Sequence, residues 1–180
     1  MDKIELTVQD VSRGISYKEM YILLLREVNG LRKLPLMIGS AEAQTIVAKL
    51  HPGIQPPFLM ADVLHSVTMR YNIDIDSIVI HKVEEGVFWA FTLFRRETEI
   101  SGFELRASDA VCLALTYRIP LYVEKKLFER QYMREQGDGL VSLPINSLSL
   151  TLLQEALKAA VHDENFELAS QLRDEIKRRK

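Results

Sequence analysis

Residues 103–109 read Phe-Glu-Leu-Arg-Ala-Ser-Asp, and this stretch marks the point where an alternating strand runs directly into a helix. Glu104 and Arg106 are two positions apart, so their side chains lie on the same side of that strand. Ser108 and Asp109 follow in the first helical turn, where a serine oxygen can satisfy free amides and an acid complements the helix dipole. The stretch therefore predicts a strand-to-helix junction at which three ionisable groups converge.

The same kind of junction occurs earlier in the chain. Residues 40–43 read Ser-Ala-Glu-Ala and again stand between a strand and a helix, as Ala-Ser-Asp-Ala does at 107–110. We therefore predict a partial internal duplication, with Ser40 capping a helix over 41–50 and Ser108 capping a helix over 109–117. A serine and an acid at such a position are also an ordinary capping device, so capping and ligand binding both remain open.

The rest of the chain predicts a mainly antiparallel sheet packed with helices. Apolar or alternating segments predict strands at 2–12, 19–28, 34–38, 73–82, 86–96, 98–106 and 121–123, with turns at 13–16 and at Asn29-Gly30. Further helices are predicted at 58–70, after a proline-rich elbow at 55–57, and at 124–135. Residues 137–148 show no periodicity, which is typical of a linker. The sequence thus predicts an α+β domain over 1–135, a linker over 136–150 and an all-α hairpin over 151–180.

Composition limits the classes of protein and of partner. The net charge is −2, from 23 basic and 25 acidic residues, so any contact with nucleic acid must be local. Apolar residues make up 47% of the 180 residues, yet no apolar run is long enough to span a bilayer. The N-terminus lacks the blocks of an export signal, and the single cysteine, Cys112, cannot form an internal disulfide. These features predict a soluble cytoplasmic protein.

The junction at 103–109 is the best candidate for chemistry. Acids and an arginine beside free helix amides suit a divalent ion together with a phosphate. Ion pairing of Arg106 with Glu104, Asp109 or Asp62 is the structural alternative, and the residues alone leave both open. The chain has no Gly-rich phosphate loop, no zinc-type Cys/His spacing and no dinucleotide fingerprint, so nothing supports nucleotide hydrolysis or redox chemistry.

Five motifs occur in order along residues 1–132. They are Leu-Pro-Leu-Met-Ile-Gly-x-x-Glu-Ala at 34–43, Asp-Val-Leu at 62–64, Gly-x-Phe-x-Ala at 86–90, Arg-x-Ser-Asp-Ala-x-x-Leu-Ala-Leu at 106–115, and Pro-Leu-Tyr-Val at 120–123. Together they resemble the bifunctional nuclease domain family. The resemblance implies a compact α/β domain that is often dimeric, some members of which cleave both DNA and RNA.

The resemblance also implies roles for the polar positions of the family pattern. These positions are Glu42, Asp62, Glu104, Arg106, Ser108 and Asp109. In a metal-dependent nuclease, the four acids would hold Mg²⁺ or Mn²⁺ and Arg106 would stabilise charge on the scissile phosphate. Asp62, Glu104, Arg106 and Asp109 are then the expected catalytic residues, and Glu42 and Ser108 the expected binding residues.

One segment departs from the family pattern. Where many members have Arg-Pro-x-Thr-His-Asp, residues 57–62 read Pro-Phe-Leu-Met-Ala-Asp, so the arginine, the threonine and the histidine are missing. If that histidine carries a proton, hydrolysis is weakened or absent here; if it only orients a loop, little is lost. His65 lies one helical turn away and could substitute. The alternative function is therefore a non-catalytic dimeric regulator.

The last thirty residues predict two short amphipathic helices folded back at 162–165. The apolar stripes are Leu153, Ala156, Leu157, Ala160 and Val161 in the first helix, and Phe166, Ala169, Leu172 and Ile176 in the second. A hairpin of this size cannot bury both stripes, so the remainder should meet a second copy, another protein or the body of the chain.

The pattern Phe-Glu-x-Ala-x-x-Leu-Arg-Asp-x-Ile at 166–176 resembles the UVR motif. This motif is a helical hairpin of bacterial excision-repair nuclease subunits, and it recurs elsewhere as an interaction module. The resemblance implies that residues 151–180 recruit a protein partner, from a repair or a protein-quality-control assembly, while the body forms a homodimer.

Overall fold

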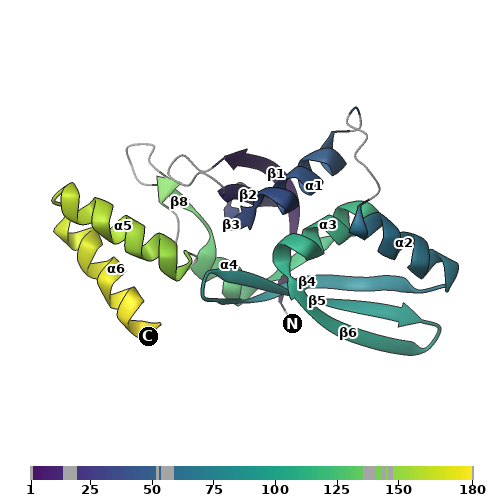
Figure 1. The fold of residues 1–180 in the computed structure, drawn as a ribbon. Coiled ribbons are helices and arrows are strands. Elements are labelled where there is room, and N and C mark those ends of the chain that lie inside the picture. Colours follow the sequence, from purple (N-terminus) through teal and green to yellow (C-terminus); the bar gives the residue numbers. More distant parts are fainter. Residues whose placement is uncertain are drawn as a thin grey trace.

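Two antiparallel meanders of three strands each build the main sheet. The computed structural model describes residues 2–13, 20–51, 53, 59–135, 141–142, 145 and 148–179. The first meander comprises β1 (Lys3–Arg13), β2 (Met20–Glu27) and β3 (Lys33–Gly39), and the second comprises β4 (Asp74–Glu84), β5 (Val87–Arg96) and β6 (Glu99–Arg106). Between them, β7 (Leu121–Glu124) pairs antiparallel with β1 and parallel with β4. The strand order is therefore β3-β2-β1-β7-β4-β5-β6 (Figure 1).

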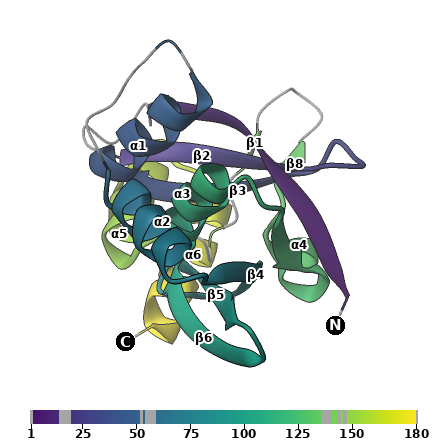
Figure 2. The same cartoon turned by 90° about the vertical axis from the view of Figure 1, so that its right-hand side faces the viewer.

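Each meander runs directly into a helix of 11 residues: α1 (Ser40–Leu50) follows β3, and α3 (Ala107–Tyr117) follows β6. Each helix packs on its own meander, and α1 and α3 pack against each other. A third helix, α2 (Met60–Arg70), packs on α3 (Figure 2). The predicted α+β class, mainly antiparallel sheet and internal duplication are confirmed.

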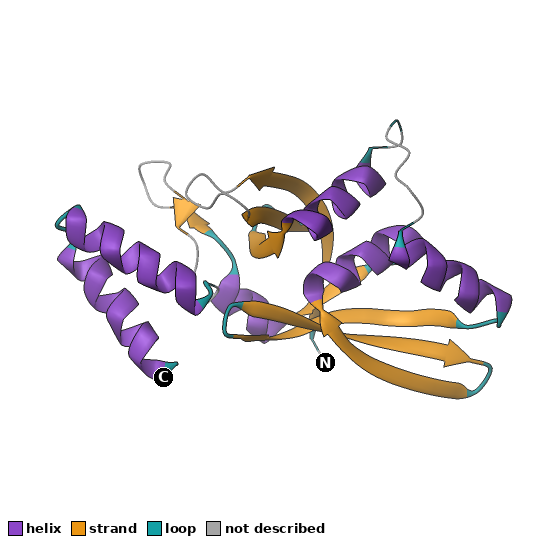
Figure 3. Cartoon of the chain, viewed as in Figure 1, coloured by secondary structure: helices purple, strands orange, loops and turns teal. Residues whose placement is uncertain are grey.

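The core lies between the sheet and these helices. Most of α3 is buried, and its buried residues are mainly small: Ala107, Ser108, Ala110, Val111, Cys112, Leu113 and Ala114. Small side chains allow α3 to approach both the sheet and α1 closely. On β5, Phe88, Ala90 and Thr92 face this core, whereas Phe91 is 41% exposed on the opposite face. Figure 3 shows α3 over one face of β4–β6 and no described helix over the other.

The predicted serine caps are wrong. The N-cap residue of α1 is Gly39 and that of α3 is Arg106, and neither makes a side-chain capping bond. Because each strand continues into its helix without a turn, the cap position falls on the last strand residue. Ser40 is therefore the first residue of α1, and Ser108 lies inside the first turn of α3, where it is buried.

The helix predicted at 124–135 is shorter than expected. It forms α4 (Lys125–Gln131), and the chain becomes extended at Tyr132, whose ring stacks on Phe128 at 5.9 Å between centroids. Beyond it, β8 (Arg134–Glu135) pairs antiparallel with β9 (Val141–Ser142), so part of the predicted linker is a short strand. The turn predicted at 13–16 falls largely, and the elbow at 55–57 entirely, outside the described residues.

The predicted C-terminal hairpin is confirmed as α5 (Leu150–His162) and α6 (Phe166–Arg178). Side chains cap both helices: Ser149 accepts from the Leu152 amide, and Asn165 accepts from the Leu168 amide. The hairpin has its own buried cluster of Leu148, Leu152, Leu153, Ala160, Ala169, Leu172 and Ile176. Met37 of β3 packs against this cluster and so links the hairpin to the sheet.

Two residues predicted to lie in the hairpin stripes are not buried. Val161 is 54% exposed and Phe166 is 69% exposed. Both residues flank the turn between α5 and α6, and they lie outside the buried cluster of the hairpin. No helix among the described residues is both long enough and apolar enough to cross a membrane.

Candidate functional site

Arg106 connects two acids that come from different halves of the duplicated fold. Its Nε donates to Asp109 Oδ2 at 3.0 Å, and its Nη2 lies 3.1 Å from Glu42 Oε1. Glu42 is the third residue of α1 and Asp109 is the third residue of α3, so the two acids occupy equivalent positions. The packing of α1 on α3 brings these first turns together at the end of β6. The structure thus unites three of the predicted site residues.

The electrostatics of this trio favour the charged form of Arg106. The hydrogen bond with Asp109, followed by the charges of Asp109 and Glu42, raises the pKa of Arg106 above its ordinary value. Both acids lie in the first turn of a helix, where the helix dipole stabilises negative charge. Two carboxylates and one guanidinium leave one net negative charge, so an approaching phosphate is repelled unless a cation compensates.

The trio lies beside two hollows in the surface. A cavity of about 400 Å³ is lined by Glu42 and Asp109 together with mainly apolar residues of α1, α2 and α3. A smaller cavity of about 190 Å³ lies between β3 and β5 and is lined by Gly39, Glu42, Arg106 and Ser108 among others. A Cβ at Gly39 would stand 2.6 Å from Glu42 Oε2, so glycine at this position leaves room for the Glu42 carboxylate.

Asp62 has a different partner. Its Oδ1 pairs with Lys49 Nζ of α1, and its Oδ2 accepts the Leu59 amide at 3.0 Å. The hydrogen bond from Lys49 is the largest cause that lowers the pKa of Asp62. Asp62 therefore ties the start of α2 to the last turn of α1, and among the described residues Arg106 pairs with Glu42 and Asp109 instead.

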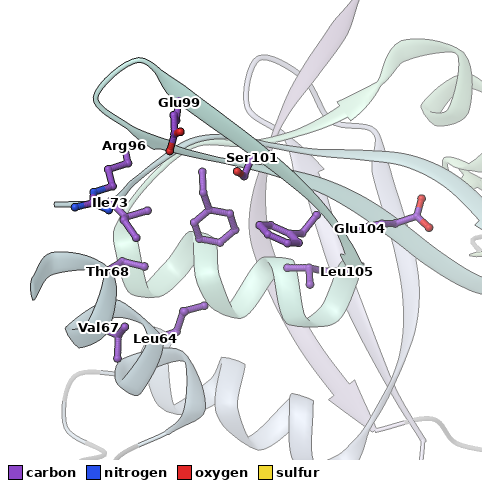
Figure 4. A pocket seen from close by; sticks show the side chains of 11 residues that line it. Leu64, Val67, Thr68, Ile73, Arg96, Glu99, Ser101, Glu104 and Leu105 are labelled. Carbon is purple, nitrogen blue, oxygen red and sulfur yellow. The ribbon is translucent and has the colours of Figure 1, made fainter. Parts of the chain in front are cut away.

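Glu104 lies on the uncovered face of the sheet. Its carboxylate is 3.0 Å from Lys82 Nζ and 2.9 Å from His81 Nε2, both on β4. The hydrogen bond from Lys82 is the main cause that lowers the pKa of Glu104. Figure 4 shows the Glu104 side chain pointing away from the cavity that lies between β6 and α2. Glu104 therefore does not share a site with Glu42 and Asp109.

The predicted cluster of four carboxylates around one metal ion is not assembled. Within the described part of the chain, no group of three or more His, Cys, Asp or Glu residues could hold a metal ion. Asp62 and Glu104 are each neutralised by a lysine. The remaining pair, Glu42 and Asp109, does match the one or two carboxylates with which Mg²⁺ is usually bound when a substrate phosphate supplies further oxygens.

Three residues important for these pairings were not predicted from the sequence. They are Lys49, which binds Asp62, and His81 and Lys82, which bind Glu104. The candidate substitute His65 packs edge-on against Tyr117, with ring centroids 4.6 Å apart. Burial raises the pKa of the Cys112 thiol to about 12, in keeping with a structural role for this residue.

Residues 23–136 match the family described as the Bifunctional nuclease domain, and residues 148–179 match the family described as the UvrB/uvrC motif. Two proteins of Mycobacterium tuberculosis, "Uncharacterized protein Rv1829" of strain H37Rv and "Uncharacterized protein MT1877" of strain CDC 1551, are each 36% identical over 105 residues. The aligned part is 58% of this chain and 62% of each relative, so the chain spans about three fifths of the length of these curated relatives.

Proposed function

Because the chain belongs to the bifunctional nuclease domain family, we propose that it hydrolyses phosphodiester bonds of DNA or RNA at the site formed by Glu42, Arg106 and Asp109. The observation that carries this proposal is the double contact of Arg106, which gathers acids from both halves of the fold. The Arg106 side chain is 52% exposed, so a phosphate can reach the guanidinium from solvent. Ser108 lines the smaller cavity and belongs to the proposed binding surface.

The net charge of the trio explains why the proposed reaction needs a divalent ion. Glu42 and Asp109 would hold Mg²⁺ or Mn²⁺, which when bound supplies charge neutralisation and a more acidic water. Nε and Nη2 of Arg106 face the two acids, so Nη1 would donate to a phosphate oxygen and stabilise the charge that develops on it. Asp109, whose side chain is 45% exposed, is the acid better placed to accept a proton from water.

The test uses the full chain purified from a nuclease-free host. Single-stranded DNA and RNA should be cut with Mg²⁺ or Mn²⁺ and left intact with a chelator. Asp109→Ala should abolish cutting, whereas Asp74→Ala, at an exposed aspartate at the start of β4, should not. Undiminished cutting by Asp109→Ala would rule out this site. Loss of cutting in a stably folded Glu104→Gln protein would instead move the chemistry to the other face of the sheet.

A second candidate function is recruitment of a protein partner through the hairpin. Phe166 is 69% exposed and Val161 is 54% exposed, so the turn of the hairpin presents an apolar surface that the described residues do not cover. A partner with an apolar pocket, from a repair or protein-quality-control assembly, would bind there. Phe166→Ser should remove that partner in a pull-down with the full chain, and an unchanged set of captured proteins would contradict the proposal.

We further propose that the body forms a homodimer and resides in the cytoplasm. The uncovered face of β5 and β6 carries Phe91 and Ile100, which are 41% and 51% exposed, and it offers an apolar contact to a second copy. The single unpaired thiol, Cys112, suits a reducing compartment. Light scattering over a range of protein concentrations tests the dimer: a monomer mass at the highest concentration, or a dimer unaffected by Phe91→Asp, would contradict it.

A further inference from the structure

Two cavities lie next to each other along α2. The larger, of about 650 Å³, lies between α2 and the strands β5 and β6 (Figure 4). The smaller, of about 400 Å³, is the one that contains Glu42 and Asp109. Leu64 and Leu105 line both of them, so the larger cavity adjoins the proposed site at these two side chains. We call the two cavities together the α2 groove.

The walls of the α2 groove are apolar and partly aromatic. Phe94 and Phe103 both line the larger cavity and form an edge-to-face pair with ring centroids 5.7 Å apart. Phe103 is 55% exposed, although it is a large aromatic residue. An exposed ring that lines a hollow offers a flat surface on which another planar group can stack.

The charged groups lie at the two ends of the groove. Glu42 and Asp109, which both contact Arg106, line one end, and Arg96 lines the other end together with Glu99. Within the described part of the chain, the Arg96 side chain makes no ion pair or hydrogen bond. Arg96 is paired with Glu99 in the sheet, and Glu99 is seven residues before Arg106 on β6, so the two arginines are about 23 Å apart along the strand. That length accommodates a few nucleotides of an extended single strand.

We propose that the α2 groove binds unpaired bases of the same strand whose phosphate is held at Arg106, so that the substrate is single-stranded DNA or RNA. This inference rests on the proposed nuclease function. A base would stack on Phe103, and Arg96 would contact a phosphate a few nucleotides from the one at Arg106. A duplex keeps its bases paired and stacked on one another, so it cannot present them to the groove.

The test measures binding separately from cleavage. Fluorescence anisotropy follows a labelled ten-nucleotide DNA with phosphorothioate linkages, alone or annealed to its complement, in the presence of Mg²⁺. The single strand should bind at least about tenfold more tightly than the duplex. Phe103→Ala should weaken single-strand binding by about tenfold, as expected for loss of one stacked base, and Phe103→Tyr should retain it.

Ile100→Ala is the matched control. Ile100 is on the same strand and is 51% exposed, but it lies on the opposite face, so its variant should bind like the unmodified protein. Equal affinity for single strand and duplex, or equal effects of Phe103→Ala and Ile100→Ala, would overturn the groove proposal. If either result were found and Arg106→Gln still abolished cleavage, the proposed nuclease function would stand without the groove proposal. If the protein bound no oligonucleotide but bound an apolar peptide in the groove, the groove proposal and the proposed nuclease function would both be overturned.

Discussion

Glu42 and Asp109 occupy the same position in two helices and contact the same guanidinium. Glu42 Oε1 is 3.1 Å from Arg106 Nη2, and Asp109 Oδ2 is 3.0 Å from Arg106 Nε. The duplicated fold therefore has equivalent acids in its two halves but an arginine in only one, since Gly39 stands at the end of β3 where Arg106 stands at the end of β6. The exchange of arginine for glycine makes the site asymmetric.

Gly39→Ala should disturb the site without disturbing the fold. The backbone of Gly39 has φ −76° and ψ 170°, which alanine adopts without strain, but the new Cβ would stand 2.6 Å from Glu42 Oε2. The Glu42 carboxylate must then move away from Arg106. We expect nuclease activity to fall by tenfold or more, with a free energy of unfolding within about 0.5 kcal/mol of the original.

The control for this change is Gly53→Ala, because a Cβ at Gly53 would meet none of the described residues within 4 Å. Steady-state cleavage rates and urea unfolding of both variants provide the measurement. Equal activity of the two variants would show that the position of the Glu42 carboxylate is unimportant.

Arg106→Lys should abolish cleavage at a small cost in stability. A lysine has one ammonium group and cannot hold Glu42 and Asp109 in the fixed fork that the guanidinium provides. Because Arg106 is 52% exposed, solvent screens its ion pairs, and the expected destabilisation is only about 0.5–1 kcal/mol. Urea unfolding at low and high salt measures the change. A loss of several kcal/mol would mean that Arg106 serves the fold rather than the chemistry.

The fold was predictable because its signals are local. The alternation in β4 and β6, the Asn29-Gly30 turn and the two strand-to-helix junctions can all be recognised from residues that are neighbours in the sequence. The pair of Arg106 with Asp109 was predictable for the same reason, since both belong to one junction, whereas the contact of Arg106 with Glu42 depends on the packing of α1 on α3.

The positions of Asp62 and Glu104 depend on features that the sequence pattern does not show. A register shift between Ile80 and Lys82 marks a bulge in β4, and a bulge allows both His81 and Lys82 to reach the face that carries Glu104. Asp62 contacts Lys49 because of the way α1 and α2 are oriented, and the hydrophobic periodicity of the sequence does not predict that orientation. The four acids of the family pattern therefore lie in three places, beside Arg106, beside Lys49 and beside Lys82.

Leu172→Ala should destabilise the hairpin far more than Phe166→Ala. Leu172 is 1% exposed in the hairpin cluster, so its truncation should destabilise the hairpin by about 2–4 kcal/mol. Phe166 is 69% exposed, so its truncation should change stability by less than about 0.5 kcal/mol. Amide hydrogen exchange in α5 and α6 reports the difference. Strong deprotection by Phe166→Ala would place Phe166 inside the hairpin core.

Gly86→Ala should loosen the attachment of the hairpin to the sheet. Gly86, in the turn between β4 and β5, has φ +82°, which is strained for alanine, and its Cβ would lie 2.6 Å from the Leu148 carbonyl carbon. Leu148 belongs to the hairpin cluster, and its carbonyl accepts a hydrogen bond from Arg179. We expect faster proteolysis between the body and α5, together with a loss of about 1–3 kcal/mol. Proteolysis no faster than in Gly53→Ala would contradict a tight contact at this turn.

Asp62→Asn should make the free energy of unfolding depend less on pH in the acid range. The pKa of Asp62 is lower in the folded protein than in the unfolded chain, where it is about 3.9, mainly because of Lys49. The contribution of Asp62 to stability is therefore fully present above about pH 5 and is lost as the pH falls through the folded pKa. The Asp62 side chain is 22% exposed, and we expect the variant to lose about 1–2 kcal/mol at pH 7 and less at pH 3. Urea unfolding between pH 3 and 7 measures this, and a constant difference between the two proteins across that range would show that the Lys49 pair does not depend on the charge of Asp62.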